Sequence, residues 1–409
     1  MKKEILFVID SLDVAGAEKS LVTLLNLLDY SKYSVDLILF SHGHLLEKLV
    51  PSEVNILDPF TYTTFSNLSL QEAVTKSFAP SHFKMLRSRM KYSFTIRTKK
   101  RSNAQKARIF WENTAKVIED NPKTYDIAIS YAQGVPTFYV ADKVKAKKKL
   151  AWVNVSYRLQ EKDRQFQKKY YDRYDDIVTV SDSAKAVFLE TFPEYENKIS
   201  ILYDINNPQL ISHMAEIGTG YEDSFTGIRI LTIGRLAHQK GYDVAMKACK
   251  KLKEAGVSFR WYVLGKGPLQ AEIEAYMREN DLMEHFILLG VEANPYPYIK
   301  QADIYVQTSR FEGFGLAIAE ARMLNIPVVT SKFDAVYNQM VEGKNGLVVD
   351  RNATAVFDGI QRMINEPDLR QNIITYLSAE KKGNVEEIEK FYQLINTSTN
   401  SVGERESTK

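Results

Sequence analysis

The chain has 409 residues, a formal net charge of +3, 44% hydrophobic residues and 26% charged residues. This composition is close to the globular average and excludes an extended disordered protein, and the length exceeds the roughly 250–300 residues at which single cores stop growing. The single cysteine, Cys249, excludes an internal disulfide, and no stretch approaches the roughly 18 apolar residues of a spanning helix. We therefore expect two domains and a cytoplasmic protein.

Strand-like and helix-like segments alternate in the first half, which predicts an α/β domain with a parallel sheet over residues 1–206. The first helix is expected over residues 17–28. Ser181 is placed to cap a later helix that continues through Glu190. The expected strands are residues 4–9, 34–40, 126–130, 150–153, 177–180 and 198–202.

The segment between Lys84 and Arg108 carries ten Lys or Arg residues and no acidic residue, with apolar side chains interleaved. This pattern predicts a basic amphipathic segment that rests on an anionic membrane, and a solvated basic helix is the alternative. Nucleic-acid binding is not expected, because no recognition motif accompanies the segment.

The α/β alternation pauses at residues 207–227, where Pro208 and several glycines predict a linker. It restarts in a second domain, expected over residues 228–380. A helix is expected over 381–396, and a disordered tail over 397–409. The expected strands are residues 228–233, 259–264, 286–289, 304–307, 327–330 and 346–349.

Three loops of the second domain follow expected strands and carry residues suited to a phosphorylated sugar. The block from Arg310 to Ala321 offers backbone N–H groups at a helix start, and two carboxylates suited to sugar hydroxyls. A loop at 234–241 carries two cations that can converge on a diphosphate, and a tight turn at 264–268 can line a nucleotide. The candidate residues are Glu312, Gly313, Phe314, Gly315 and Glu320 in the first loop, Arg235 and Lys240 in the second, and Gly265 and Gly267 in the third.

These blocks together resemble the retaining glycosyltransferase family four, of GT-B fold, in which two Rossmann-like domains face each other across a cleft. The resemblance runs from about residue 228 to residue 350 and includes 290–298 and 343–347. It implies that Arg235 and Lys240 hold the donor diphosphate, Glu312 the transferred sugar and Glu320 the ribose. It also implies that the helix at 381–396 crosses back to the first domain, that no cofactor is needed, and that no covalent nucleophile is assigned.

Two segments of the first domain resemble the same family with one departure each. Asp13 to Glu18 resembles a Gly-Gly-Ala-Glu turn in which Ala15 replaces one glycine, while Gly16 still permits close approach to the diphosphate and acceptor. In the segment 151–157, Asn154 stands where many relatives carry histidine. Asn154 can bond a sugar hydroxyl but cannot accept a proton, so either a general base is unnecessary or the chain is impaired.

The sequence therefore predicts a metal-independent retaining hexosyltransferase. It would move a sugar from a nucleotide diphosphate, most simply UDP, to a glycan or lipid-linked acceptor in surface polysaccharide or glycolipid synthesis, with a peripheral position on the inner face of the membrane. No Asp-x-Asp motif is present, and zinc binding by His42, His44 and Glu47 is disfavoured. A non-catalytic GT-B partner subunit and a sugar-nucleotide epimerase remain the alternatives.

Overall fold

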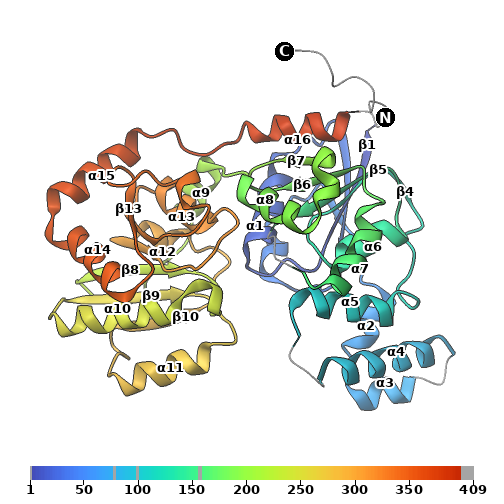
Figure 1. The fold of residues 1–409 in the computed structure, drawn as a ribbon, viewed down its shortest axis with the longest axis horizontal. Helices are drawn as coiled ribbons and strands as arrows, with labels where there is room; N and C mark the ends of the chain where they lie inside the picture. The colour runs from blue at the N-terminus through green and yellow to red at the C-terminus, as the bar shows by residue number, and fades with distance from the viewer. Residues whose placement is uncertain (1, 77–79, 98–100, 155–158, 398–409) are drawn as a thin grey trace. The chain divides into compact units, whose positions relative to one another are not determined.

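The computed structural model describes residues 2–76, 80–97, 101–154 and 159–397, and these fall into two compact units (Figure 1). The first unit takes its described residues from Met1–Asp13, Ala17–Tyr203 and Glu386–Lys409, and the second from Val14–Gly16 and Asp204–Val385. Each unit has its own parallel sheet, so the predicted class of two α/β domains is confirmed.

The first unit is built on a seven-stranded parallel sheet with the order β3-β2-β1-β4-β5-β6-β7. The carboxyl-terminal parts of its central strands are wholly buried, because helices cover both faces of a parallel sheet and leave no polar side. Only β3 was not expected, since its three residues are too few to show a pattern. The strands are β1 (Lys3–Ile9), β2 (Tyr33–Leu39), β3 (Val54–Ile56), β4 (Thr124–Ser130), β5 (Lys145–Val153), β6 (Asp176–Thr179) and β7 (Ile199–Ile201).

Helices of the first unit follow these strands and, within the part of the chain that the structure describes, four consecutive helices lie between β3 and β4 along the chain. The predicted cap is confirmed, since the Ser181 hydroxyl accepts a hydrogen bond from the backbone N–H of Ala184 at 3.1 Å. The helices are α1 (Gly16–Leu27), α2 (Thr61–Ser66), α3 (Leu70–Lys76), α4 (Pro80–Arg97), α5 (Asn103–Thr114), α6 (Val135–Lys143), α7 (Glu161–Tyr171) and α8 (Asp182–Thr191), with short 3-10 turns η1 (Leu45–Leu49) and η2 (Pro193–Lys198).

The segment between Lys84 and Arg108 is not one continuous surface. It spans most of α4, residues 98–100, which lie outside the described residues, and the first half of α5. Arg108 is buried, where its Nε donates to Asp163 at 2.7 Å, so this cation cannot face a membrane. The exposure expected of this basic segment thus fails for Arg108, because a buried carboxylate on α7 draws the guanidinium inward, and membrane contact by α4 stays a prediction.

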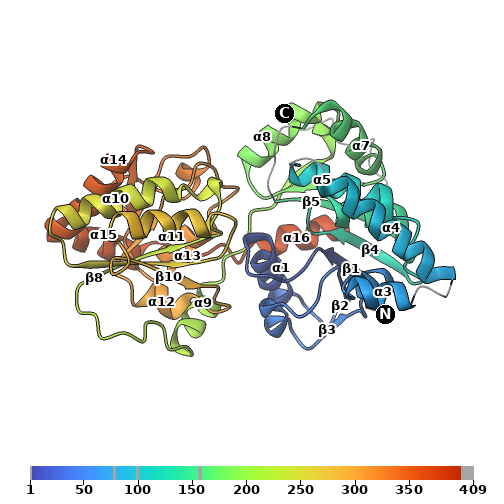
Figure 2. The same ribbon diagram turned by 90° about the horizontal axis from the view of Figure 1, so that it is seen from below.

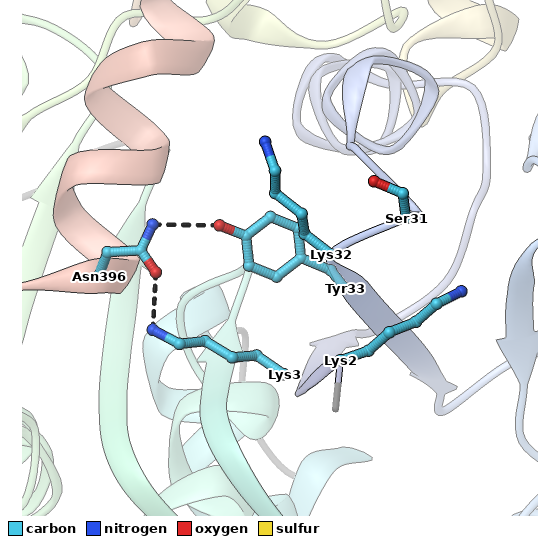
Figure 3. Close-up of a pocket in the computed structure, with 6 residues that line it drawn as sticks. All are labelled: Lys2, Lys3, Ser31, Lys32, Tyr33 and Asn396. Carbon is cyan, nitrogen blue, oxygen red and sulfur yellow. Dashed lines mark hydrogen bonds between the residues drawn. The ribbon is translucent and has the colours of Figure 1, made fainter.

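The C-terminal helix α16 (Glu387–Asn396) belongs to the first unit. Phe391 stacks on Phe7 of β1 with ring centroids 6.2 Å apart. At the end of the helix, the Asn396 side chain accepts from Lys3 Nζ at 2.7 Å and donates to the Tyr33 hydroxyl at 3.1 Å (Figure 3). The shallow hollow beside these residues lies where β1 and β2 begin, whereas ligands of open α/β sheets bind beyond the carboxyl ends of the strands.

The second unit holds a six-stranded parallel sheet with the order β10-β9-β8-β11-β12-β13. Helices pack on both faces, with α10 on one side and α9 and α12 on the other (Figure 2). The strands are β8 (Ile228–Ile233), β9 (Phe259–Leu264), β10 (Phe286–Gly290), β11 (Ile304–Gln307), β12 (Val328–Ser331) and β13 (Gly346–Val349). The helices are α9 (Pro208–Glu216), α10 (Tyr242–Glu254), α11 (Gln270–Glu279), α12 (Tyr296–Lys300), α13 (Leu316–Met323), α14 (Ala353–Asn365) and α15 (Pro367–Ala379), with 3-10 turns η3 (His238–Lys240) and η4 (Val336–Asn338).

The expected linker at 207–227 contains α9 and is therefore only partly irregular. Asn207 caps this helix by accepting from the backbone N–H of Leu210 at 3.2 Å. Pro208 occupies the first helical turn, where a missing N–H costs nothing. From the sequence it is interpreted as a sign of an irregular linker, but it begins a helix.

Candidate functional site

Two loops at the carboxyl ends of β8 and β11 bring the main candidate residues together. β8 pairs with β11 in parallel, so the loops that leave their carboxyl ends emerge at the same edge of the sheet. The first loop, 234–241, carries Arg235 and Lys240, and the second, 308–315, carries Glu312. The loops are tied by two backbone carbonyls, since Thr308 Oγ1 donates to the Lys240 carbonyl at 2.9 Å and Arg310 N to that of Gln239 at 2.7 Å.

Several side chains at this edge of the sheet donate hydrogen bonds to the Glu312 carboxylate. Its Oε1 accepts from Lys240 Nζ at 2.6 Å, from Gln307 Nε2 at 2.8 Å and from Ser309 Oγ at 2.5 Å. Because three donors hold one oxygen, the side chain is fixed before any ligand arrives. The ammonium of Lys240 has three N–H donors, so its bond to Glu312 leaves it able to donate to a phosphate as well.

Sequence reasoning missed the two uncharged donors, Gln307 and Ser309. Gln307 is the last residue of β11, and both side chains are buried, with exposed fractions of 2% and 0%. A polar residue at the end of an otherwise apolar buried strand must find a hydrogen-bond partner, and that requirement was the available signal. The partner could not be read from the sequence, because the loop beyond Ser309 decides it.

Glu320 lies on α13 and is buried with an exposed fraction of 4%. Its Oε1 accepts from the hydroxyl of Tyr296 at 3.0 Å, and Tyr296 was not among the expected residues. Burial raises the pKa of Tyr296 well above its usual value, and the nearby Glu320 carboxylate adds to the shift. The tyrosine therefore stays protonated and keeps donating to Glu320.

The hydroxyl of Tyr305 links the surroundings of the two glutamates. Burial raises its pKa strongly, and the charges of Glu312 and Glu320 both act in the same direction. The same hydroxyl donates to Gln307 Oε1 at 2.5 Å, which orients the amide that in turn donates to Glu312. One buried and one partly buried carboxylate thus lie within electrostatic reach of one neutral hydroxyl.

The glycines of this edge permit close packing of the loops. A Cβ at Gly265 would lie 2.0 Å from the carbonyl oxygen of Gly234, and one at Gly267 would lie 2.3 Å from that of Leu236. Gly315 has a φ of +87°, which a side chain would strain, and it precedes the first residue of α13. The N–H groups of the first helical turn lack partners within the helix and suit an anion.

The remaining candidates of this edge differ in how they are held. The Arg235 side chain is exposed on the loop after β8. The carbonyls of Phe314 and Gly315 both accept from Gln339 Nε2, at 2.5 and 3.2 Å, which fixes the turn that includes Gly313.

Two further candidates, Gly16 and Asn154, follow strands of the seven-stranded sheet. Gly16 begins α1 after the loop that follows β1. Asn154 directly follows β5, and its Nδ2 donates to the carbonyl of Tyr131, just beyond β4, at 2.7 Å. The Tyr131 ring stacks on Trp152 with centroids 4.7 Å apart. Residues 155–158, part of the motif around Asn154, lie outside the described residues.

The histidines at 42 and 44 are not assembled as a metal site. Glu47 accepts from the backbone N–H of His44 at 2.8 Å, and the His44 ring lies 2.9 Å from Ser41 Oγ. Across residues 2–76, 80–97, 101–154 and 159–397, no group of three or more His, Cys, Asp or Glu residues is placed to hold a metal. In those same ranges, no helix has both the length and the apolarity to cross a membrane.

Comparisons with known proteins relate the second unit to one family. Residues 225–379 match the family model described as glycosyl transferases group 1. Among curated proteins, the chain is 27% identical over 203 residues to an N-acetylgalactosaminyltransferase of Campylobacter jejuni that acts on a diphospho-undecaprenol, covering 49% of this chain and 54% of the relative. It is 24% identical over 216 residues to the capsular polysaccharide glycosyltransferase CapM of Staphylococcus aureus, covering 48% and 54%.

The chain spans about half the length of the curated relatives that it matches, but its fold matches solved structures from end to end. A structure of Anabaena Alr3699/HepE with UDP and glucose has a TM-score of 0.69 at 16% identity, covering 96% of this chain and 98% of that one. A TarM variant of S. aureus, solved with UDP, has a TM-score of 0.66 at 15% identity, covering 97% and 100%. The predicted GT-B fold is confirmed.

Proposed function

We propose that this chain, whose residues 225–379 match the glycosyl transferases group 1 model, moves a hexose from a nucleoside-diphosphate sugar to a glycan or lipid-linked acceptor. The acceptor product would be a surface polysaccharide or glycolipid, made at the cytoplasmic face. The observation that carries the proposal is the Lys240–Glu312 pair, fixed by Gln307 and Ser309 at the carboxyl edge of the second sheet. The relatives named for polysaccharide synthesis, and the one acting on a lipid diphosphate, support the choice of acceptor class.

The geometry suits transfer because each charged side chain would act on a different part of the donor. When the bond between the anomeric carbon and the phosphate oxygen breaks, the diphosphate keeps the electron pair and gains negative charge. Lys240 and Arg235 would stabilise that charge without reorganisation. The acceptor hydroxyl forms the new bond to the anomeric carbon and loses its proton. Glu312 would bind the transferred sugar, and Glu320 with Tyr296 the ribose.

UDP is proposed as the nucleotide because the two structural neighbours described above were solved with it. Retention of the anomeric configuration and independence from metal ions are part of the proposal. A metal ion is not required in this proposal, because Lys240 and Arg235 would supply the positive charge that the ion otherwise provides.

The proposal is tested with purified full-length chain and a panel of UDP-, GDP- and ADP-sugars. The bound donor should raise the melting temperature of the native protein, by ligand linkage. Turnover should persist in a chelator, and the product should keep the anomeric configuration of the donor. Glu312→Gln should lower kcat by about 10²–10³-fold, the cost of losing one such polar contact. Donor binding without any transfer or hydrolysis would overturn the proposal.

A non-catalytic partner subunit is the second candidate, and Asn154 favours it. This side chain cannot accept a proton, and its amide is already bonded to the Tyr131 carbonyl. In that case the donor panel would give no turnover in either the parent or Glu312→Gln. An epimerase would instead convert the free sugar nucleotide in the absence of any acceptor, which the same assay detects.

A further inference from the structure

Helix α4 (Pro80–Arg97) exposes three large apolar side chains on one face of the first unit. The exposed fractions are 60% for Phe83, 58% for Met90 and 77% for Phe94. Their spacing of seven and four residues places them on one stripe of an α-helix. Single exposed apolar residues are common, but three aligned on one helix are a feature that needs a partner.

The opposite face of α4 is anchored in the first unit, so the exposed stripe cannot simply turn inward. Met85 is buried in the core, and Ser88 Oγ donates to the carbonyl of Asn113 on α5. The Tyr92 ring meets Phe110 of α5 edge-on, with centroids 5.4 Å apart. The helix is therefore held with its apolar stripe facing solvent.

Cations border this stripe on both sides. Projected around an ideal helix, Arg97 falls beside Met90 on one flank, while Arg87, Lys91 and Lys84 fall on the other. All four are exposed. We define the α4 face as the stripe Phe83, Met90 and Phe94 with these four bordering cations.

Helix α3 (Leu70–Lys76) lies beside α4 and adds more apolar surface (Figures 1 and 2). Leu70 and Val74, one turn apart, have exposed fractions of 62% and 54%. The one acidic residue of this helix, Glu72, accepts from the backbone N–H of Ser69 at 2.8 Å and caps the helix start. The Glu72 carboxylate is thus hydrogen-bonded to the backbone at the start of α3.

We propose that the α4 face docks on the surface of an anionic lipid bilayer, with Phe83, Met90 and Phe94 between the headgroups and the cations on lipid phosphates. Apolar residues at the centre and Lys and Arg at the border are the arrangement by which interfacial helices bind. A second copy of the chain is a poorer occupant, because it would oppose four cations to four cations. A nucleic-acid backbone would pair with the cations but would gain nothing from Met90.

Vesicle binding tests this docking and needs neither donor nor acceptor, so its failure is distinguishable from failure of the proposed sugar transfer. Full-length chain is sedimented with vesicles of phosphatidylcholine alone and of phosphatidylcholine containing phosphatidylglycerol. The chain should bind the anionic vesicles, and the binding should weaken with added salt.

Two variants separate the apolar and charged contributions. The triple variant Phe83→Ser/Met90→Ser/Phe94→Ser should weaken binding by roughly tenfold or more. The double variant Arg87→Gln/Lys91→Gln should weaken it by about fivefold per cation. Matched controls in the second unit, Ile217→Ser/Met283→Ser and Lys247→Gln/Arg278→Gln, should bind like the parent chain.

Three results would overturn the proposal. Equal binding to neutral and anionic vesicles would remove the role of the cations, and undiminished binding by the triple apolar variant would remove the role of the stripe. Dimerisation that the triple variant abolishes, with no vesicle binding by the parent, would assign the face to a second copy. All variants remain interpretable if they unfold at the same temperature as the parent, which is expected because the changed side chains are exposed.

Discussion

Two ion pairs of nearly equal length lie in very different settings. Arg108 Nε meets Asp163 Oδ1 at 2.7 Å between helices α5 and α7, and the two side chains are 8% and 4% exposed. Lys240 Nζ meets Glu312 Oε1 at 2.6 Å on two loops at a sheet edge, and these side chains are 18% and 9% exposed. The distance alone therefore does not tell a structural pair from a functional one.

What differs is the surrounding structure. The Arg108 pair joins two helices, with Glu112 as a further partner at 3.2 Å, and it closes off a packed interior. The Lys240 pair lies where strands end, on loops that pack closely at glycines and beside the uncharged donors Gln307 and Ser309. Removing Arg108 should therefore cost stability, and removing Lys240 should cost activity.

The largest effect is expected for Arg108→Met. It leaves Asp163 buried without its cation, which should lower the free energy of unfolding by about 3–5 kcal/mol. Urea unfolding followed through Trp111 and Trp152, which both lie in the first unit, measures it. Adding Asp163→Leu should recover part of the loss, because no charge then remains unpaired. A cost below about 1 kcal/mol for the single variant would mean that the pair is not structural.

Next is Lys240→Gln, which should lower kcat by about 10²–10³-fold while the urea midpoint stays close to that of the parent. The reason is that Gln307 and Ser309 still bond to Glu312, while the diphosphate loses a cation. Lys247→Gln, an exposed lysine on α10, is the matched control and should leave both quantities unchanged. Parent-like turnover in Lys240→Gln would remove this pair from the reaction.

The ion pairs of Asp223 add a pH-dependent case to the comparison, because their contribution to stability depends on the charge of one carboxyl. Burial raises the pKa of this carboxyl, but hydrogen bonds from Tyr262, Arg229 and Arg260 outweigh it and hold the pKa well below the usual value. Its stabilisation is therefore present above the unfolded pKa of about 3.9 and is lost as the pH falls below that value.

Asp223→Asn should accordingly lower stability by about 1–2 kcal/mol at pH 7, since charge-assisted hydrogen bonds become neutral ones. The difference between parent and variant should shrink as the pH falls from 5 toward 2. Urea unfolding at pH 7, 5 and 3 follows it. A gap that does not change with pH would show that the charge of Asp223 is not what stabilises its contacts.

The smallest effect is expected at the exposed pair of Lys32 and Asp29, which are 2.9 Å apart with side chains 71% and 34% exposed. Lys32→Gln should leave the urea midpoint close to that of the parent, because water and salt screen the attraction. A clear loss of stability at this site would contradict the distinction between buried and exposed pairs.

Much of the fold could be predicted from the sequence. Strands β8, β9, β11 and β13 have the expected bounds, because buried parallel strands are continuous apolar runs ended by glycine or polar residues. The sequence did not reveal β3, which is too short to show a period, or α9, whose first-turn proline resembled a loop signal.

The charged residues of the candidate site could be predicted, but the uncharged residues that hydrogen-bond to them could not. Lys240 and Glu312 stood out by their loops, but Gln307, Ser309 and Tyr296 did not. Gln307 and Ser309 depend on how the loop after β11 folds back toward them, and Tyr296 depends on Glu320 of another helix. Arg108 shows the reverse error, since a basic run predicted exposure where Asp163 imposes burial.

The sequence by itself determined the class of fold and which charged residues stand at the carboxyl ends of β8 and β11, because periodicity and glycine-bounded loops are local properties. Only the tertiary structure decided that Lys240 meets Glu312 across 72 residues, that Tyr305 lies near both glutamates, and that Phe94 faces solvent. Those outcomes depend on which strands pair and which helix faces are covered, and no local pattern encodes them.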